Sequence, residues 1–295
     1  MSLFPSILVP LDGSRMAAQA LGCAVWLAAR LGARLHILSA TPQERPAREE
    51  LTRLKVPDAH WPMITLHQAQ AYPEEAILAA LARYDVSLVV LTASGETAET
   101  SGSGSGPDRI VGHVTRAVIE RSRSPVLLLP PSYREELPWK RALVPLSGEV
   151  EADDALALAV RLANVVDLEV HVAHVTDVVT GDESLAARAR YADALHHEYP
   201  QQLAELVGRA LPHCTQDECA RIADVALCHG DVAAELLDLM ARKRISLLVV
   251  GWRGRFMSGH APVLKQLVRA MTQPVLLVKP ERRMGFRLKV GEEIE

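Results

Sequence analysis

The stretch ILVPL at residues 7–11 decides the fold, because it recurs as ALVPL at residues 142–146, an offset of 135 residues. Two further pairs follow in the same order: SLVVL at 87–91 with SLLVV at 246–250, and SPVLLL at 124–129 with QPVLLV at 273–278. Three matches in one order indicate an internal repeat. The chain is therefore predicted to hold two copies of one domain, a first copy at 1–138 and a second copy at 139–295.

Each copy alternates short apolar runs, rich in Val, Leu and Ile, with segments of helical period. This alternation is typical of a parallel sheet covered by helices on both faces. The expected strands lie near 6–10, 34–40, 64–69, 87–91 and 126–129, and near 141–145, 168–174, 223–228, 246–250 and 275–278. The predicted class is α/β, with two tandem, doubly wound, five-stranded parallel-sheet domains.

Local signals mark several boundaries. Ser14 is suited to cap the first helix of the first copy, and Gly32 is suited to end it. The corresponding helix of the second copy is expected over about 151–164. The proline-bearing segment 130–138 is expected to link the copies. The weak alternation in 281–295 leaves an additional edge strand open.

Composition excludes several classes of function. The net charge is −4, aromatic residues make up 4%, and neither copy has a basic surplus, so nucleic acid is not an expected partner. No apolar run reaches the roughly 18 to 20 residues of a membrane span. The sequence opens without a secretory signal pattern, and the four cysteines suggest no disulfide framework, so a cytoplasmic location is expected.

Ligands of doubly wound sheets bind beyond the carboxyl ends of the strands. Asp12 follows the first strand, where its carboxylate can accept hydrogen bonds from ribose or adenine. The alternative is that Asp12 and Ser14 only cap the first helix. After the fourth strand, a glycine-bearing loop leads to Gly112 and a helix N-terminus, whose free N–H groups and dipole favour phosphate.

These residues resemble a known family. Universal stress proteins that bind ATP have an aspartate after strand one and Gly-x2-Gly-x9-Gly-Ser/Thr after strand four, followed by a Pro-Val strand. The sequence matches with Asp12, Gly95, Gly112 and Pro125-Val126. The resemblance implies an adenine nucleotide α hydrolase-like fold, and an intramolecular pseudo-dimer through the two fifth strands; association of two whole chains is left open.

The resemblance also implies ATP or AMP as ligand of the first copy. Its base and ribose would contact Pro10, Leu11, Asp12 and Ala40. Its phosphates would contact Thr92, Gly95, Gly112, His113, Val114 and Thr115.

The first copy departs from the family motif in three places. Thr92 replaces the first glycine, sixteen residues separate Gly95 from Gly112, and His113 replaces the hydroxyl residue. The Ser/Gly run at 101–106 either wraps phosphates with its N–H groups or forms a solvated loop. The nucleotide site is therefore expected to be degenerate.

The second copy departs differently. Ser147 replaces the aspartate, Gly251 and Gly254 keep the first glycine pair, and Ala261-Pro262 falls where Gly-Ser is expected, although aligning Gly259-His260 instead stays open. The second copy is not expected to bind ATP in the family manner.

Other chemistry has weaker support. His213, Cys214, Cys219, Cys228 and His229 lie close in sequence but lack a paired Cys-x2-Cys, so structural roles are favoured over a metal site. The Gly-x-Ser-x-Gly string at 102–106 matches a nucleophile elbow in sequence. A nucleophile elbow directly follows a strand, however, and no strand is expected before this string. No catalytic residue is assigned.

The leading hypothesis is a regulatory or protective binding module of stress response, with a degenerate nucleotide site and an unknown protein partner. One alternative is a signalling protein that binds ATP and hydrolyses it slowly. Another is that the second copy binds a different small ligand or a metal.

Overall fold

The computed structural model describes residues 3–93, 111–134, 136–147, 149–176, 204–205, 207–212, 214–252 and 261–280. The first copy contains β1 (Ser6–Pro10), α1 (Arg15–Leu31), β2 (Arg34–Ala40), α2 (Ala47–Arg53), η1 (Asp58–Met63), β3 (Ile64–Ala69), α3 (Pro73–Arg83), β4 (Leu88–Thr92), α5 (His113–Arg121) and β5 (Val126–Leu129). The second copy contains β6 (Arg141–Pro145), α6 (Val150–Val166), β7 (Glu169–Thr176), α8 (Gln216–Cys219), β8 (Ile222–His229), α9 (Val232–Lys243), β9 (Leu247–Gly251), α10 (Pro262–Ala270) and β10 (Val275–Val278).

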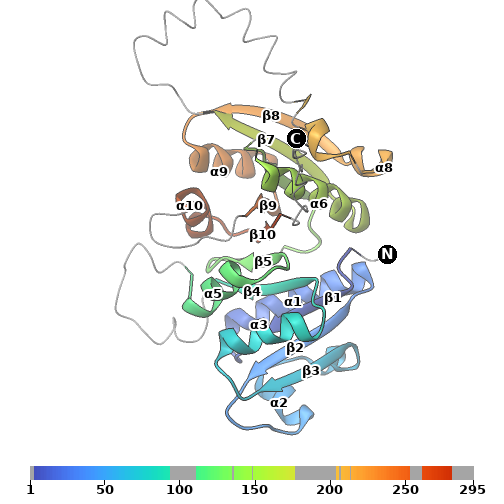
Figure 1. The fold of residues 1–295 in the computed structure, drawn as a ribbon, viewed down its shortest axis with the longest axis vertical. Helices are drawn as coiled ribbons and strands as arrows, with labels where there is room; N and C mark the ends of the chain where they lie inside the picture. The colour runs from blue at the N-terminus through green and yellow to red at the C-terminus, as the bar shows by residue number, and fades with distance from the viewer. Residues whose placement is uncertain are drawn as a thin grey trace, which may run out of the picture.

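The strands form one ten-stranded sheet in the order β3-β2-β1-β4-β5-β10-β9-β6-β7-β8 (Figure 1). The neighbours within each copy are parallel, whereas β5 and β10 pair antiparallel, with Leu127 opposite Leu276. The order read from each end toward the centre is the same in both copies. The predicted α/β class and the pseudo-dimer through the fifth strands are confirmed.

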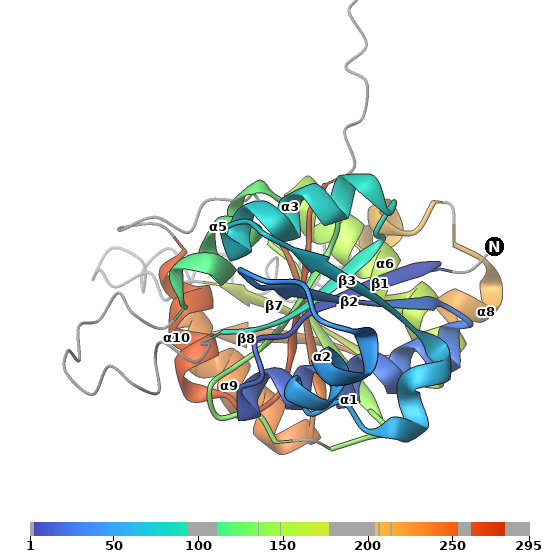
Figure 2. The same ribbon diagram turned by 90° about the horizontal axis from the view of Figure 1, so that it is seen from below.

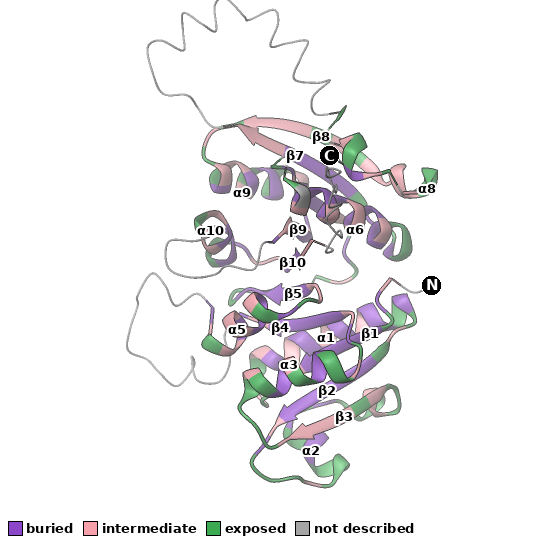
Figure 3. Ribbon diagram, in the orientation of Figure 1, coloured by how far each residue is buried: buried purple, intermediate pink, exposed green. Residues whose placement is uncertain are grey.

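Every predicted strand is present within two residues of its expected bounds. The central strands are buried, whereas the edge strands β3 and β8 are mostly half-buried (Figure 3). The continuous apolar runs therefore mark strands that have a helical layer on each face. The edge strand considered for 281–295 lies outside the described residues.

Helix α1 begins and ends as its sequence predicts. The Ser14 side chain accepts a hydrogen bond from the Ala17 backbone N–H at 3.1 Å. Gly32 ends the helix with φ 62°, a left-handed conformation that glycine adopts without steric cost. Figure 2 shows that α1 and α2 cover one face of β1, β2 and β3, and that α3 and α5 cover the other. This arrangement directs the N-termini of α1, α3 and α5 toward the carboxyl ends of the strands.

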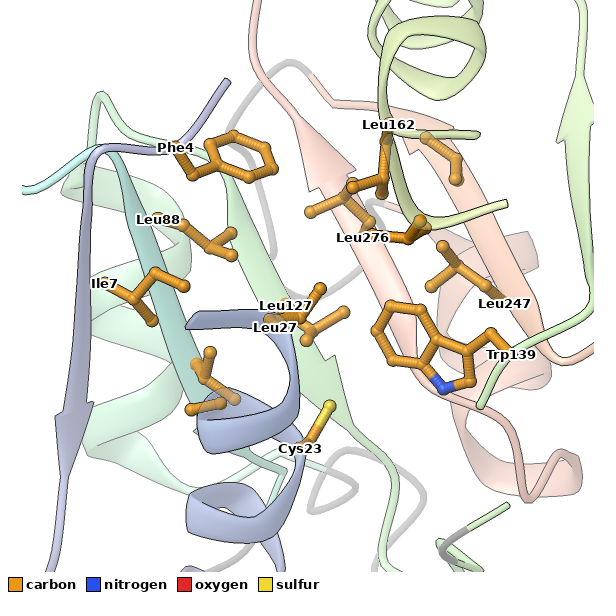
Figure 4. Close-up of a cluster of buried hydrophobic side chains, with 14 of the residues drawn as sticks. Phe4, Ile7, Cys23, Leu27, Leu88, Leu127, Trp139, Leu162, Leu247 and Leu276 are labelled. Atoms are coloured by element: carbon orange, nitrogen blue, oxygen red, sulfur yellow. The ribbon is translucent and has the colours of Figure 1, made fainter. Parts of the chain in front are cut away.

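One hydrophobic cluster crosses from the first copy to the second. It joins Leu27 on α1 and Leu127 on β5 to Leu276 on β10 and to Trp139, which lies just before β6 (Figure 4). Trp139 is buried and meets Trp26 of α1 edge to face, with ring centroids 4.9 Å apart. The two copies therefore share a core as well as a sheet.

Among the helices that the structure describes, none combines the length and the apolar character that a membrane span requires.

Candidate functional site

A cavity of about 580 Å³ opens at the carboxyl ends of β1 and β4, a size typical of small-molecule sites. The residues that line it are Pro10, Leu11, Asp12, Ala17, Leu38, Ala40, Pro73, Ile77, Leu91, Thr92, Gly112, His113, Val114 and Thr115. Of the ten predicted site residues, the structure thus brings nine together. Gly95, like the Ser/Gly run at 101–106, lies outside the described residues.

Asp12 lies in the turn between β1 and α1. Its Oδ1 accepts the backbone N–H of Ser14 at 2.8 Å, while the Ser14 hydroxyl oxygen caps the helix. The alternative in which Asp12 and Ser14 both only cap the helix therefore describes Ser14 alone, because Asp12 holds the turn and also lines the cavity. A carboxylate that is held by its own loop is well placed to accept hydrogen bonds from a ligand.

Helix α2 supports this turn from outside the cavity. Glu50 of α2 is fully buried, and its carboxylate accepts hydrogen bonds from Ser39 at 2.5 Å and Arg53 at 2.6 Å. Hydrogen bonding from Arg53 above all, with help from Ser39 and Arg45, lowers the pKa of Glu50 to about 2, against the opposing effect of burial. Arg53 in turn reaches the backbone carbonyl of Asp12 at 3.5 Å, a long contact.

The N-terminus of α5 forms the opposite wall. Gly112, the N-cap residue, is held beside β4 because its N–H donates to the Ala93 carbonyl at 2.7 Å. Its own carbonyl accepts the N–H of Arg116, the first hydrogen bond of the helix. Gly112 has no side chain with which to cap this end of α5, and no capping side chain is found among the described residues. The N–H groups of the first helical turn therefore have the orientation and dipole that favour an anion.

The side chain of Thr115 has a structural role. Its buried hydroxyl donates to the Thr92 carbonyl at 2.8 Å, which ties the first turn of α5 to the end of β4. The contribution of Thr115 to an anion site would therefore come from its backbone N–H. His113, one residue into the helix, is exposed at the rim.

The remaining wall is apolar, and the sequence did not indicate it. Pro73 and Ile77 from α3, with Leu38 and Leu91 from the strands, form a surface of the kind that packs against a flat ring. In the sequence these residues look like ordinary core positions of a strand and a helix. Only Pro73 is typical of the first position of a helix, and a helix that follows a strand starts near the carboxyl end of that strand, where the cavity opens.

The equivalent rim of the second copy is built differently. A Cβ atom added at Gly251 would lie 2.3 Å from the backbone of Glu151, so the first turn of α6 lies directly against the end of β9. Gly251 thus has a packing reason to be glycine. In the first copy the equivalent strand position is Thr92, which carries a side chain and lines the cavity.

The start of α10 also differs from that of α5. Ala261 is the N-cap residue, with φ 53°, and Pro262 opens the helix without an N–H group. The alignment of Ala261 with Gly112 therefore holds, since each immediately precedes the last helix of its copy. Gly254 and Gly259-His260 lie outside the described residues.

The cysteines show no sign of a metal site in the part of the chain that the structure describes. No three His, Cys, Asp or Glu side chains come together there in a way that could hold a metal ion. Burial raises the pKa of the Cys214 and Cys228 thiols, which disfavours the thiolate that metals bind. His213 lies outside the described residues.

Comparisons with known proteins agree with this architecture. A sequence model described as the universal stress protein family matches residues 4–62, 41–130 and 138–279. No curated protein matches the chain.

Solved structures similar to the chain span nearly all of it. A putative universal stress protein from Pseudomonas aeruginosa UCBPP-PA14 has a TM-score of 0.63 at 16% identity, covering 94% of both chains. A functionally unknown protein from Pseudomonas aeruginosa PAO1 gives a TM-score of 0.63 at 16% identity, with 94% of this chain and 93% of that chain covered. A universal stress protein from Archaeoglobus fulgidus DSM 4304 gives 0.60 at 16% identity, with 95% and 98% covered. At these identities the likeness concerns the fold alone.

Proposed function

Because the chain belongs to the universal stress protein family, we propose that its first copy binds an adenine nucleotide in the cavity beside Asp12. In this proposal the protein acts in the cytoplasm as a regulatory or protective module of stress response, and the bound nucleotide sets its state. Slow hydrolysis of ATP stays a prediction from the sequence.

The observation that carries the proposal is the composition of one cavity. An apolar wall from Pro73, Ile77 and Leu91 lies in the same space as the Asp12 carboxylate and the uncapped N-terminus of α5. A flat base suits the apolar wall, ribose hydroxyls suit the carboxylate, and phosphates suit the helix terminus. These are the three parts of a nucleotide.

We further propose one nucleotide per chain. In the second copy, Ser147 replaces the carboxylate, the start of α6 lies against Gly251, and Pro262 lacks one of the N–H groups that would bind phosphate. Each difference removes an interaction that the first copy can offer.

Isothermal titration calorimetry with ATP, ADP and AMP tests the proposal. The expected result is saturable binding with one site per chain. Asp12→Ala should weaken it by roughly ten- to a hundredfold, because a hydrogen bond to a charged group is lost.

Ser147→Ala is the matched control, since Ser147 occupies the position of Asp12 in the second copy and is exposed. This variant should bind as the unmodified protein does. Absence of heat at millimolar nucleotide would exclude the proposed function, and equal losses in the two variants would remove Asp12 from the site.

A further inference from the structure

Tyr72 is an exposed aromatic residue at the edge of the cavity. Its exposed fraction is 73%, the highest among the large hydrophobic residues exposed in the described part of the chain. It directly precedes Pro73, which lines the cavity, whereas Tyr72 itself does not line it. A large ring in water at this place has no packing role in the fold.

Tyr72 also occupies the N-cap position of a helix, where Ser, Thr, Asp or Asn usually caps the backbone N–H groups. It is the N-cap residue of α3, and it makes no side-chain capping hydrogen bond. The N-cap residue of the equivalent helix α9 is Asp231, whose Oδ1 accepts the Ala234 N–H at 2.9 Å. A capping side chain stabilises the first turn of a helix, and α3 of the first copy lacks this contribution from its N-cap residue.

We propose that Tyr72 is a specificity-determining residue whose ring covers the adenine base. A base packed against Pro73 and Ile77 would lie next to Tyr72, the residue that precedes Pro73 in the chain. A tyrosine ring has two side-chain torsions to fix and therefore covers the face of a base at low entropic cost. The first copy, in which Asp12 lines the cavity, has Tyr72 at this N-cap position. The second copy, in which Ser147 replaces Asp12, has the capping residue Asp231 there.

This inference rests on the proposed function, because it needs a base in the cavity. It adds a residue that would touch the ligand, and it predicts a preference for ligands with an aromatic base over a sugar phosphate alone. The physical basis is stacking between an aromatic side chain and a base.

The test is ATP binding by calorimetry, with thermal unfolding measured on the same samples. Tyr72→Ala should weaken ATP binding by roughly five- to a hundredfold, and Tyr72→Phe should keep it within about twofold. Tyr72→Ser should weaken binding like the alanine variant, yet raise the melting temperature by about 2 °C, because serine supplies the missing cap without adding charge.

Asp231→Ala is the control in the second copy. It should lower the melting temperature through loss of its cap and leave ATP binding unchanged. ATP affinity would then fall in Tyr72→Ser while its melting temperature rises, and the melting temperature would fall in Asp231→Ala while its ATP affinity stays unchanged. If Tyr72 had only a structural role, affinity would follow stability in both variants.

The outcomes separate the two proposals. If the unmodified protein binds ATP and Tyr72→Ala binds it equally well, the role of Tyr72 is refuted while the nucleotide site stands. If Asp231→Ala weakens ATP binding as much as Tyr72→Ala does, the effect follows stability and the role of Tyr72 is again refuted. If the unmodified protein binds no adenine nucleotide, both proposals fail together.

Discussion

Gly112 holds the start of α5 through its backbone, yet neither its backbone angles nor its neighbours among the described residues require glycine. Its backbone angles, φ −60° and ψ 157°, are ones that any residue adopts. Among the described residues, a Cβ atom added there would meet the Ala93 carbonyl alone, at 3.6 Å, an ordinary contact. The fold therefore tolerates a side chain at position 112, beside a cavity where that side chain would occupy ligand space.

We predict that Gly112→Val abolishes or strongly weakens adenine nucleotide binding while changing the free energy of unfolding by less than about 1 kcal/mol. The valine side chain would stand between a phosphate and the N–H groups of α5. Calorimetry and urea denaturation measure the two effects. Loss of binding accompanied by a large loss of stability would contradict the prediction.

A pair of histidines on neighbouring strands forms a second local feature. His36 Nδ1 and His67 Nε2 are 2.9 Å apart, so one of these nitrogens must donate and the other accept. Both rings stack on Tyr84. Burial first, and then the positive charge of Arg34, lowers the pKa of His36. Burial, followed by His36 and Arg83, lowers the pKa of His67.

These lowered pKa values predict a pH dependence of stability. The unfolded chain takes up protons near pH 6.5, and the folded chain does so only at lower pH. The stabilisation is therefore complete above pH 6.5 and declines as the pH falls below it. Urea denaturation of the unmodified protein and of His67→Gln at pH 8 and pH 5.5 measures this. The variant should lose less stability between the two pH values, and equal losses would contradict the assignment.

At the scale of elements, α5 connects the cavity to the second copy. Its N-terminus lines the cavity, and its last carbonyls are bound by side chains from beyond β9 and β10. Lys279 Nζ donates to the Glu120 carbonyl at 2.9 Å and to the Ser122 carbonyl, and Trp252 Nε1 contacts the Ile119 carbonyl at 3.4 Å. The second copy thus supplies hydrogen bonds that a helix C-terminus cannot make for itself.

Lys279→Met should destabilise the protein by about 1–2 kcal/mol, because methionine keeps the apolar stem but leaves the carbonyls without these donors. The loss is moderated because burial, which lowers the pKa of Lys279, disfavours its charged form in the folded protein. Urea denaturation measures the change, with the exposed Lys140→Met as control. Equal effects of the two substitutions would show that the carbonyl contacts contribute nothing.

At the scale of the whole molecule, the two copies are expected to unfold together. The hydrophobic cluster that contains Leu127 and Leu276 crosses the β5–β10 pair, and it includes Trp139, which lies just before β6. Neither copy could separate without exposing this cluster and two strand edges to water.

We predict one cooperative unfolding transition, and we predict that Trp139→Ala lowers its free energy by about 3–5 kcal/mol, the usual cost of deleting a large buried aromatic side chain. Circular dichroism and tryptophan emission should report coincident midpoints for the unmodified protein. Two separate transitions, of which only one moves in the variant, would show that the copies are independent.

The sequence by itself determined the strands and the duplication, whereas the pairing of the fifth strands was implied by the family resemblance and is confirmed by the structure. Apolar runs such as ILVPL at 7–11 and VLLL at 126–129 are local patterns, and a local pattern suffices where both faces of a strand are buried. Nine of the ten predicted site residues also came together, because they lie at or just beyond the carboxyl ends of parallel strands or at the N-terminus of α5, and such positions meet at one edge of the sheet. The domain boundary at 138 and the binding role of these residues stay predictions.

Tertiary structure alone decided what surrounds those positions. The apolar wall of Pro73 and Ile77, the close approach of α6 to Gly251, and the binding of the α5 carbonyls by Lys279 all join residues from separate elements. Their distances depend on how helices settle on a twisted sheet and on how the two copies meet. No local pattern encodes such distances, because the same side chains at the same spacing would serve equally well as ordinary core, cap or surface residues.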